Sequence, residues 1–160
     1  MRGIKKNMNK KVKKITVLLK AINDGDSSSV FHQKCDNKGF TLVLVMTDKH
    51  KRFGGFTSVN WDQSSSYKID EKAFIFSLNN HEIYYAKNPN NKSAIYCHSS
   101  YCPTFGNGHD FYLASGCRSN NSSYDNTGAY HYDTQGKKNR LAGEYNFKVN
   151  DYEVYQLEFD

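Results

Sequence analysis

The residue types most capable of chemistry are two cysteines and two histidines within one short segment. Cys97, His98, Cys102 and His109 follow the pattern C-H-x3-C-x6-H, and thiolate sulfur and imidazole nitrogen are ligands that zinc prefers. The spacing is not that of a zinc knuckle, and neighbouring strand residues such as Cys97 and His98 point to opposite faces. The sequence therefore disfavours a metal site, and we expect no cofactor.

A cysteine nucleophile is the second chemistry to consider, with Cys35 or Cys117 as the thiolate and His109 and Asp110 as its partners. Such a thiol needs an imidazole within hydrogen-bond reach and an oxyanion hole, and no motif of a known cysteine enzyme surrounds any cysteine here. We interpret Asp110 as the cap of a turn and His109 as a loop residue. A thiol-based antioxidant enzyme is kept as an alternative.

Glycine-containing segments could be phosphate-binding loops, but their patterns are wrong. Gly54 and Gly55 lie between phenylalanines, and Gly106 and Gly108 precede a strand-like run. Neither segment has the G-x-x-x-x-G-K-[ST] pattern or a G-x-G-x-x-G that opens a helix. Glycine at a close backbone approach lets a large ring lie across a strand, and we expect Trp61 to be that ring.

Paired carboxylates could supply a general acid and a general base. Asp70 and Glu71 flank the start of a strand, whereas Glu153 and Glu158 alternate along what we expect to be an edge strand. Neither pair has a further feature of an active site. We therefore expect a protein that is not an enzyme.

The positive charge is concentrated at the N-terminus. Eight of the 22 basic residues and none of the 16 acidic residues fall in the first twenty positions, so the remainder carries a net charge of −2. Only four basic residues are arginine, the side chain that base readout favours, which argues against a sequence-specific nucleic-acid reader. We interpret residues 1–14 as a lysine-rich arm in solvent, and a tether to nucleic acid or anionic membrane stays open as an alternative.

The length and composition describe one globular domain. The chain has 160 residues, of which 38% are hydrophobic and 14% aromatic, enough for a substantial core. No apolar run approaches the 18 or so residues that a membrane span needs, and the basic N-terminus lacks the apolar core of a secretion signal. We expect an intracellular, cytoplasmic protein with four reduced cysteines.

Two helices are predicted before the first strand. Val12, Ile15, Leu19 and Ile22 recur at steps of three and four, which predicts an amphipathic helix ending near residues 23–25. A second helix should begin at Asp26 or Ser27, a capping type of residue, and end near residues 36–38 before a glycine.

From residue 40 onward, short apolar or alternating runs are separated by Asn, Gly, Ser and Asp clusters, the pattern of a β protein. We predict loops at 63–66, 88–91 and 119–126, and a break in the last strand near 150–151. The fold class is α+β and mainly β, an antiparallel two-sheet β-sandwich flanked by short helices. The predicted strands are about 40–47, 52–60, 72–79, 82–87, 94–98, 110–115, 128–133 and 144–159.

Several separate segments form one ordered pattern along residues 15–160. In the first half these are Asn23-Asp24-Gly25, Phe31-His32-x-x-Cys35-Asp36, Thr41-Leu42-Val43-Leu44, Phe53-Gly54-Gly55-Phe56-Thr57-Ser58 with Trp61, and Asp70-x-x-Ala73-Phe74-Ile75-Phe76-Ser77-Leu78. In the second half they are Pro103-x-Phe105-Gly106-x-Gly108-x-Asp110-Phe111, Ala142-Gly143 and Glu153-Val154-Tyr155. Taken in order, these segments resemble the TLDc domain family.

The resemblance implies a β-sandwich that binds proteins and has no accepted catalytic mechanism or cofactor. The family is associated with resistance to oxidative stress and with binding the vacuolar-type proton ATPase, so subunits of that ATPase are the expected partner. Most motif residues are expected to be core or turn positions: Gly25, Phe31, Gly54, Gly55, Trp61, Phe74, Phe76, Phe105, Gly106, Gly108 and Gly143. The carboxylates Asp24, Asp70, Asp110 and Glu153 could be structural or could contact a partner.

The chain departs from the family pattern at two places. The family usually has Ser-Arg-Asp-Gly where this chain has Ile22-Asn23-Asp24-Gly25, and commonly Gly-Pro-Thr-Leu where it has Gly39-Phe40-Thr41-Leu42. The missing arginine removes a fixed positive charge and a five-donor fork from that turn, which would alter a salt bridge or a partner contact.

Overall fold

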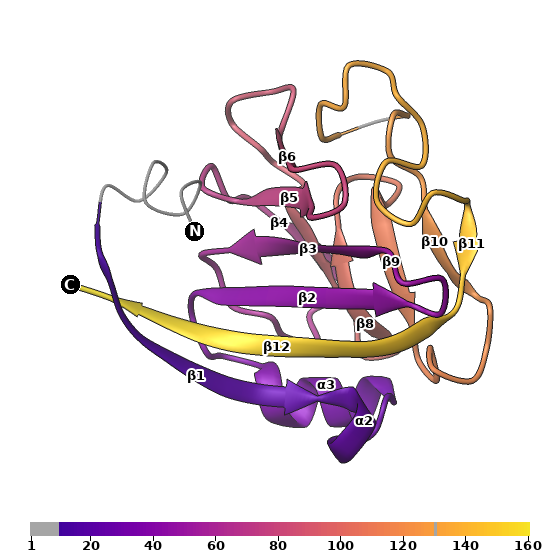
Figure 1. The fold of residues 1–160 in the computed structure, drawn as a ribbon. Helices are drawn as coiled ribbons and strands as arrows, with labels where there is room; N and C mark the ends of the chain where they lie inside the picture. Colours follow the sequence, from indigo (N-terminus) through magenta and orange to yellow (C-terminus); the bar gives the residue numbers. More distant parts are fainter. Residues whose placement is uncertain (1–9, 130) are drawn as a thin grey trace.

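Two six-stranded antiparallel sheets face each other in the computed structural model, which describes residues 10–129 and 131–160 (Figure 1). The first sheet has the order β1 (Val12–Lys20), β12 (Val149–Phe159), β2 (Thr41–Thr47), β3 (Arg52–Thr57), β5 (Phe74–Ser77) and β6 (Glu82–Tyr85). The second sheet has the order β11 (Asn146–Phe147), β10 (Ser123–Asp125), β9 (Phe111–Ala114), β8 (Tyr101–Phe105), β7 (Ile95–Cys97) and β4 (Ser66–Lys68). The prediction of a mainly-β, two-sheet sandwich is confirmed.

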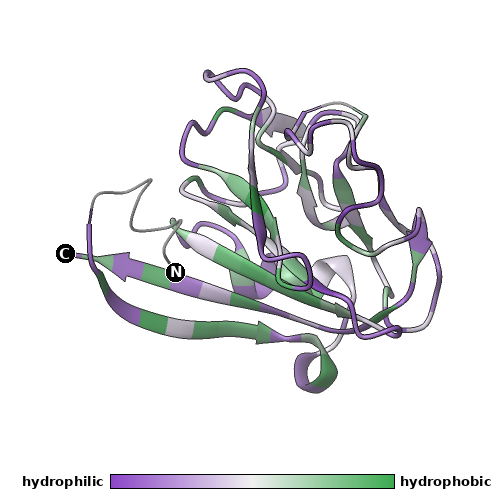
Figure 2. Cartoon of the chain, turned by 45° about the horizontal axis from the view of Figure 1, so that its top comes forward, coloured by the Kyte–Doolittle hydropathy of each residue, from purple (hydrophilic) through white to green (hydrophobic). Residues whose placement is uncertain are grey.

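The core lies between the inner faces of the two sheets. Residues of β2 alternate between buried and half-buried, as expected of a strand with one face toward a core. From the first sheet, the Phe53 ring packs edge-on against Phe111 and Phe147 of the second, with ring centroids 5.3 and 5.5 Å apart. Figure 2 shows hydrophobic residues gathered in the strands and hydrophilic residues in the connecting loops.

Helix α3 (Ser28–Cys35) covers one end of the sandwich. As predicted, Ser27 caps it, because its side-chain oxygen accepts a hydrogen bond from the Val30 N–H. Phe31 packs edge-on against Trp61 with centroids 5.4 Å apart, and the Trp61 indole N–H donates to the Thr41 hydroxyl. The tryptophan therefore joins α3 to β2 in the core.

The helix predicted over residues 12–22 is wrong, because residues 12–20 form strand β1 and only α2 (Ala21–Asp24) is helical. Strand β1 pairs with the C-terminal strand β12 (Figure 1). Ile15 and Val17 are half exposed, so the apolar stripe is not buried as a helix face would be. Their β-branched side chains favour a strand. Pairing with β12, which is distant in sequence, stabilises the strand over the predicted helix. Residues 1–9 of the predicted arm lie outside the described residues.

Several other strand predictions also need correction. Within the predicted strand 128–133, the described residues 128–129 and 131–133 form no strand, and Tyr132 makes an isolated bridge to Ala86. Strand β8 was not predicted. Strands β4 and β10 lie in or beside Ser-rich and Asn-rich segments predicted as loops, because pairing with neighbouring strands outweighs their weak local preference. Strand β12 is not at an edge, since it lies between β1 and β2, and its predicted break appears as an irregularity between Val149 and Asp151.

Among the described residues, no helix is long and apolar enough to cross a membrane.

Candidate functional site

The four residues of the possible zinc site are divided between the two sides of the second sheet. Cys97 and Cys102 are buried in the core, whereas the rings of His98 and His109 contact Tyr101 on the outer face of that sheet. Within residues 10–129 and 131–160, no three potential metal ligands come together in a suitable group. The described structure therefore does not assemble these four residues into a centre.

All four cysteines are buried and none forms a disulfide. Burial raises the pKa of the Cys97 thiol to about 11 and that of Cys102 to about 12. Burial also raises the pKa of Cys35 and of Cys117 well above the ordinary range, and the nearby Asp36 adds to the effect at Cys35. Because the thiolate is the reactive form, these thiols are poor nucleophiles near neutral pH.

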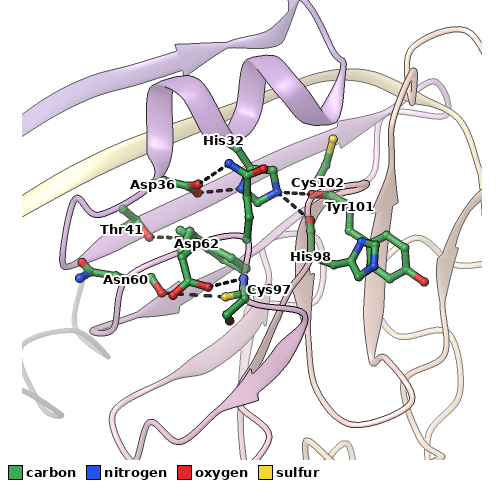
Figure 3. Close-up of polar contacts among 12 residues, drawn as sticks. His32, Asp36, Thr41, Asn60, Asp62, Cys97, His98, Tyr101 and Cys102 are labelled. Atoms are coloured by element: carbon green, nitrogen blue, oxygen red, sulfur yellow. Dashed lines mark hydrogen bonds and ion pairs between the residues drawn. The ribbon is translucent and has the colours of Figure 1, made fainter.

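A polar cluster joins helix α3 to the turn between β7 and β8 (Figure 3). His32 Nδ1 lies 2.7 Å from Asp36 Oδ1, one helical turn further on. Its Nε2 lies 2.7 Å from the His98 carbonyl oxygen and 3.0 Å from that of Tyr101. Both ring nitrogens therefore face oxygen acceptors, and the His32 side chain links α3 to the turn between β7 and β8.

His32 and Asp36 belong to the motifs that resemble the family, but the sequence did not predict them as site residues. A histidine and an aspartate four residues apart on a predicted helix were a usable signal, since such residues share a helix face. Their carbonyl partners could not have been predicted, because the turn at residues 98–101 is brought to α3 only by the tertiary fold.

Asp70 is a buried structural carboxylate. Its Oδ2 accepts hydrogen bonds from the Thr57 hydroxyl at 2.7 Å and the Ser58 N–H at 2.6 Å. Its Oδ1 accepts from the Ser58 hydroxyl and the Lys72 N–H. Three of these donors tie the carboxylate to the end of β3, and the fourth closes the turn after Asp70, so the carboxylate is committed to the fold.

Asp110 and Asp125 are both fully buried, but they differ in the number of hydrogen bonds that their carboxylates accept. Asp125 accepts two hydrogen bonds from Thr127 and one each from the Leu141 and Ala142 N–H groups. Asp110 Oδ2 accepts one from the Tyr132 N–H, whereas its Oδ1 has no hydrogen-bond partner. Burial raises the pKa of Asp110 to about 7, partly offset by the N–H groups of Tyr132 and His131.

The remaining predicted carboxylates lie at the surface beside β1. Asp24 accepts a hydrogen bond from the Lys20 N–H at 2.9 Å, and the Lys20 ammonium lies 3.9 Å from Glu153 Oε1. Glu153 also accepts a hydrogen bond from the Tyr155 hydroxyl. Gly25 ends α2 with a φ of 107°, a conformation that favours glycine. The structure thus brings Asp24 and Glu153 near one lysine, apart from Asp70 and Asp110.

Phe105, rather than the expected Trp61, is the ring that lies against Gly55. A Cβ on Gly55 would come within 2.6 Å of the Phe105 ring, and one on Gly54 within 1.9 Å of the Val43 carbonyl oxygen. Trp61 packs behind Phe105, with centroids 5.5 Å apart. The glycines are therefore required by close approach of a strand and a ring.

The other motif residues are also structural. On the outer face of the first sheet, the Phe74 ring lies against Phe56 and Phe76 in a second apolar cluster. Gly106 and Gly108 have φ values near 90°, and Gly143 has a φ of 80°. A Cβ on Gly106 would meet Asp110 Oδ1 at 1.8 Å, so this glycine makes room for the buried carboxylate.

The outer face of the second sheet carries a row of tyrosines that sequence analysis did not identify. We call it the tyrosine ladder, and its successive ring centroids are 4.6, 5.5, 4.9, 5.1 and 5.2 Å apart. One tyrosine comes from each of five paired strands and the last directly precedes β11. Its members, in order across the sheet, are Tyr67, Tyr96, Tyr101, Tyr112, Tyr124 and Tyr145.

The ladder is half exposed and carries no formal charge. Tyr67 and Tyr145, at its two ends, are 38% and 48% exposed. Burial raises the pKa of Tyr124 to about 12, with Tyr145 adding to the effect, so its hydroxyl keeps its proton. His109 lies against five of the six rings, and burial lowers its pKa, which favours the neutral imidazole. Tyrosine is enriched at protein interfaces, where its ring and hydroxyl both contribute.

A groove on the first sheet is one of several hollows in the described surface. It encloses about 200 Å³ and is lined by Leu44, Met46, Leu78 and Arg52, with Asp151 and Glu153 at its acidic side. Its volume is below the range of ligand pockets, which is about 300–1,000 Å³. Its lining includes no cysteine, serine or histidine, so we interpret the groove as a contact surface.

The described structure is a two-sheet β-sandwich that buries its four cysteines and three of its carboxylates. The outer face of its second sheet carries the tyrosine ladder, and these features are typical of an interaction module. A family model for the TLDc domain matches residues 1–158, and the chain belongs to the TLDc domain family. Over 54 residues the chain is 33% identical to the MTOR-associated protein MEAK7 of Danio rerio. That alignment covers 34% of this chain and spans 12% of the relative's length.

Proposed function

We propose that this chain is a non-enzymatic protein-binding module that acts in oxidative-stress resistance by binding the vacuolar-type proton ATPase and regulating it. Membership of the TLDc family supports the binding role. The similar MEAK7 protein is described by its association with mTOR, which is consistent with a module that works through protein partners.

The single observation that favours binding over thiol chemistry is the state of the cysteines. All four are buried, and burial raises the pKa of each thiol. A peroxide-consuming thiol needs exposure and a lowered pKa, since the thiolate attacks the oxidant. The proposed protective role therefore operates through a partner and not through oxidation of this chain's own thiols.

Affinity capture tests the proposal directly. The tagged full chain is used as bait in a nuclease-treated lysate of cells that express it, and the retained proteins are identified by mass spectrometry. Enrichment of peripheral ATPase subunits is the expected result. Their absence, with the ATPase demonstrably present in the lysate, would contradict the proposed partner.

A matched variant separates binding from thiol chemistry. Replacing the four cysteines by alanine or serine should leave ATPase capture unchanged, provided that circular dichroism confirms the fold. Peroxide consumption should be absent from both proteins. Consumption that is present in the original chain and lost in the variant would support the enzyme alternative instead.

The lysine-rich arm gives a second candidate function, a tether to nucleic acid or anionic membrane. Lys13 and Lys14 are exposed on β1, in line with this role. Such binding should weaken steeply with salt and disappear when the lysines before residue 12 are replaced by glutamine. Deletion of residues 1–14 is not a suitable test, because it would also remove the start of β1.

A further inference from the structure

We infer that a cationic pocket at one end of the first sheet binds a phosphate group, either the free ion or the phosphate of a small ester. We call it the basic pocket, and it encloses about 180 Å³. Three connections meet there: the β2–β3 turn, the β5–β6 turn and the long connection between β10 and β11 (Figure 1). This site is separate from the proposed binding of a protein partner and does not depend on it.

The charge of the basic pocket favours an anion. Its lining contains Lys51, Lys138 and Arg140 and no aspartate or glutamate. Arg140 forms an ion pair with Glu82, so the three cations and this one carboxylate leave a net charge of +2. Within residues 10–129 and 131–160, no ion pair joins the ammonium of Lys51 or Lys138 to a carboxylate. A phosphate dianion matches this charge, whereas a chloride ion or a carboxylate brings a single negative charge.

Two carboxylates close to the pocket in sequence have partners of their own. Glu144 Oε2 lies 2.7 Å from the Lys49 ammonium. Asp125 is fully buried and accepts hydrogen bonds from the Leu141 and Ala142 N–H groups. Neither carboxylate is part of the pocket lining.

Hydrogen bonds between the connections hold the basic pocket in shape. The Arg52 N–H donates to Asn79 Oδ1 at 2.6 Å, which ties the start of β3 to the β5–β6 turn. That turn is joined in the same way to the β10–β11 connection, because the Asn80 amide donates to the Arg140 carbonyl oxygen at 2.9 Å. A site that is formed before its ligand arrives loses less conformational freedom on binding.

The groups in the lining are the donors that a phosphate oxygen accepts from. A Cβ placed on Gly143 would lie 3.5 Å from Lys51 Cε, so the Lys51 side chain reaches from its turn to the β10–β11 connection. Asn79 uses its Oδ1 for the Arg52 N–H, which leaves the NH2 end of this amide as a donor. The volume is below the range of about 300–1,000 Å³ for drug-sized ligands, so the pocket fits a phosphate group and not a whole nucleotide.

The test is an NMR titration of the full, isotope-labelled chain with inorganic phosphate at about pH 8, where the dianion prevails. Potassium chloride keeps the ionic strength constant. We expect saturable shift changes confined to residues 51, 79–80 and 138–143, and no saturable change there with acetate. An equal response to acetate would overturn the inference. So would a lack of saturation at about 10 mM phosphate, since a site with a millimolar dissociation constant is about nine-tenths full there.

Glycerol phosphate distinguishes the two sources of the phosphate group. Binding of both glycerol phosphate and inorganic phosphate would support a site for phosphate esters, and binding of inorganic phosphate alone would support a site for the free ion. If phosphate binds but ATPase subunits are not captured, the basic pocket stands and the proposed partner fails.

A pair of double variants assigns the binding to the pocket lysines. Lys51→Gln combined with Lys138→Gln removes two exposed charges and should weaken phosphate binding roughly two- to thirtyfold. Lys92→Gln combined with Lys137→Gln is the matched control, because both lysines are exposed and neither lines the pocket. The control should bind phosphate as the original chain does. Unchanged affinity of the pocket variant, or an equal loss in the control, would overturn the inference.

Discussion

The buried carboxylate of Asp110 gives the sharpest quantitative prediction, which concerns the Asp110→Asn variant. Asp110 is fully buried, and its Oδ1 lacks a hydrogen-bond partner. Burial raises its pKa from 3.8 to about 7. The folded chain therefore binds one more proton than the unfolded chain between these two pH values.

The sign and size of the effect follow from this difference in proton binding. The contribution of Asp110 to stability is fully present below about pH 4 and is lost as the pH rises through about 7. Each pH unit in that window costs about 1.4 kcal/mol, so ionisation costs about 4 kcal/mol in total. An asparagine does not ionise, and its carbonyl oxygen can still accept from the Tyr132 N–H.

Urea unfolding of both proteins at about pH 5 and about pH 8 measures the effect. Relative to the original chain, Asp110→Asn should gain about 3 kcal/mol in its free energy of unfolding between these pH values. Asp48→Asn, at an exposed position, controls for the removal of one charge. A difference between Asp110→Asn and the original chain that does not change with pH would refute the reasoning.

Three further predictions follow from other contacts. Asp125→Ala removes an acceptor of four hydrogen bonds and should lower the free energy of unfolding, measured in urea, by about 3 kcal/mol. A loss below about 1 kcal/mol would contradict this role of Asp125. Gly54→Ala places a Cβ 1.9 Å from the Val43 carbonyl oxygen and should lower the free energy of unfolding by about 3 kcal/mol, seen as a lower melting temperature. An unchanged melting temperature would contradict the close approach of the two strands. The four cysteines should react with a thiol reagent only after unfolding, and rapid labelling of the folded chain near pH 7 would contradict their burial.

The correct predictions of secondary structure concern segments whose structure depends on residues a few positions away in the sequence. Residues 41–47 are an apolar run bounded by turns, and they form β2. Ser27 is a capping residue at the start of an amphipathic segment, and it caps α3. In both cases the physical cause lies within a few positions of the chain, so the sequence alone displays it.

The failures occurred where distant segments decide the structure. Residues 12–20 show apolar spacing compatible with a helix, but pairing with β12, at the other end of the chain, makes them a strand. The tyrosine ladder could not be predicted from the sequence, because its six members come from separate segments whose order in the sheet is known only from the fold. Phe105, and not the expected Trp61, packs against Gly55, and this contact also depends on how distant segments come together.

Direct binding to the isolated peripheral sector of the vacuolar-type proton ATPase tests the central claim most directly. The purified full chain and the purified sector would be mixed, with the four-cysteine variant in parallel, and resolved by size-exclusion chromatography at moderate salt. The proposal predicts that both forms of the chain co-elute with the sector. Neither form co-eluting would contradict ATPase binding, and co-elution of the original chain alone would contradict a function independent of its thiols.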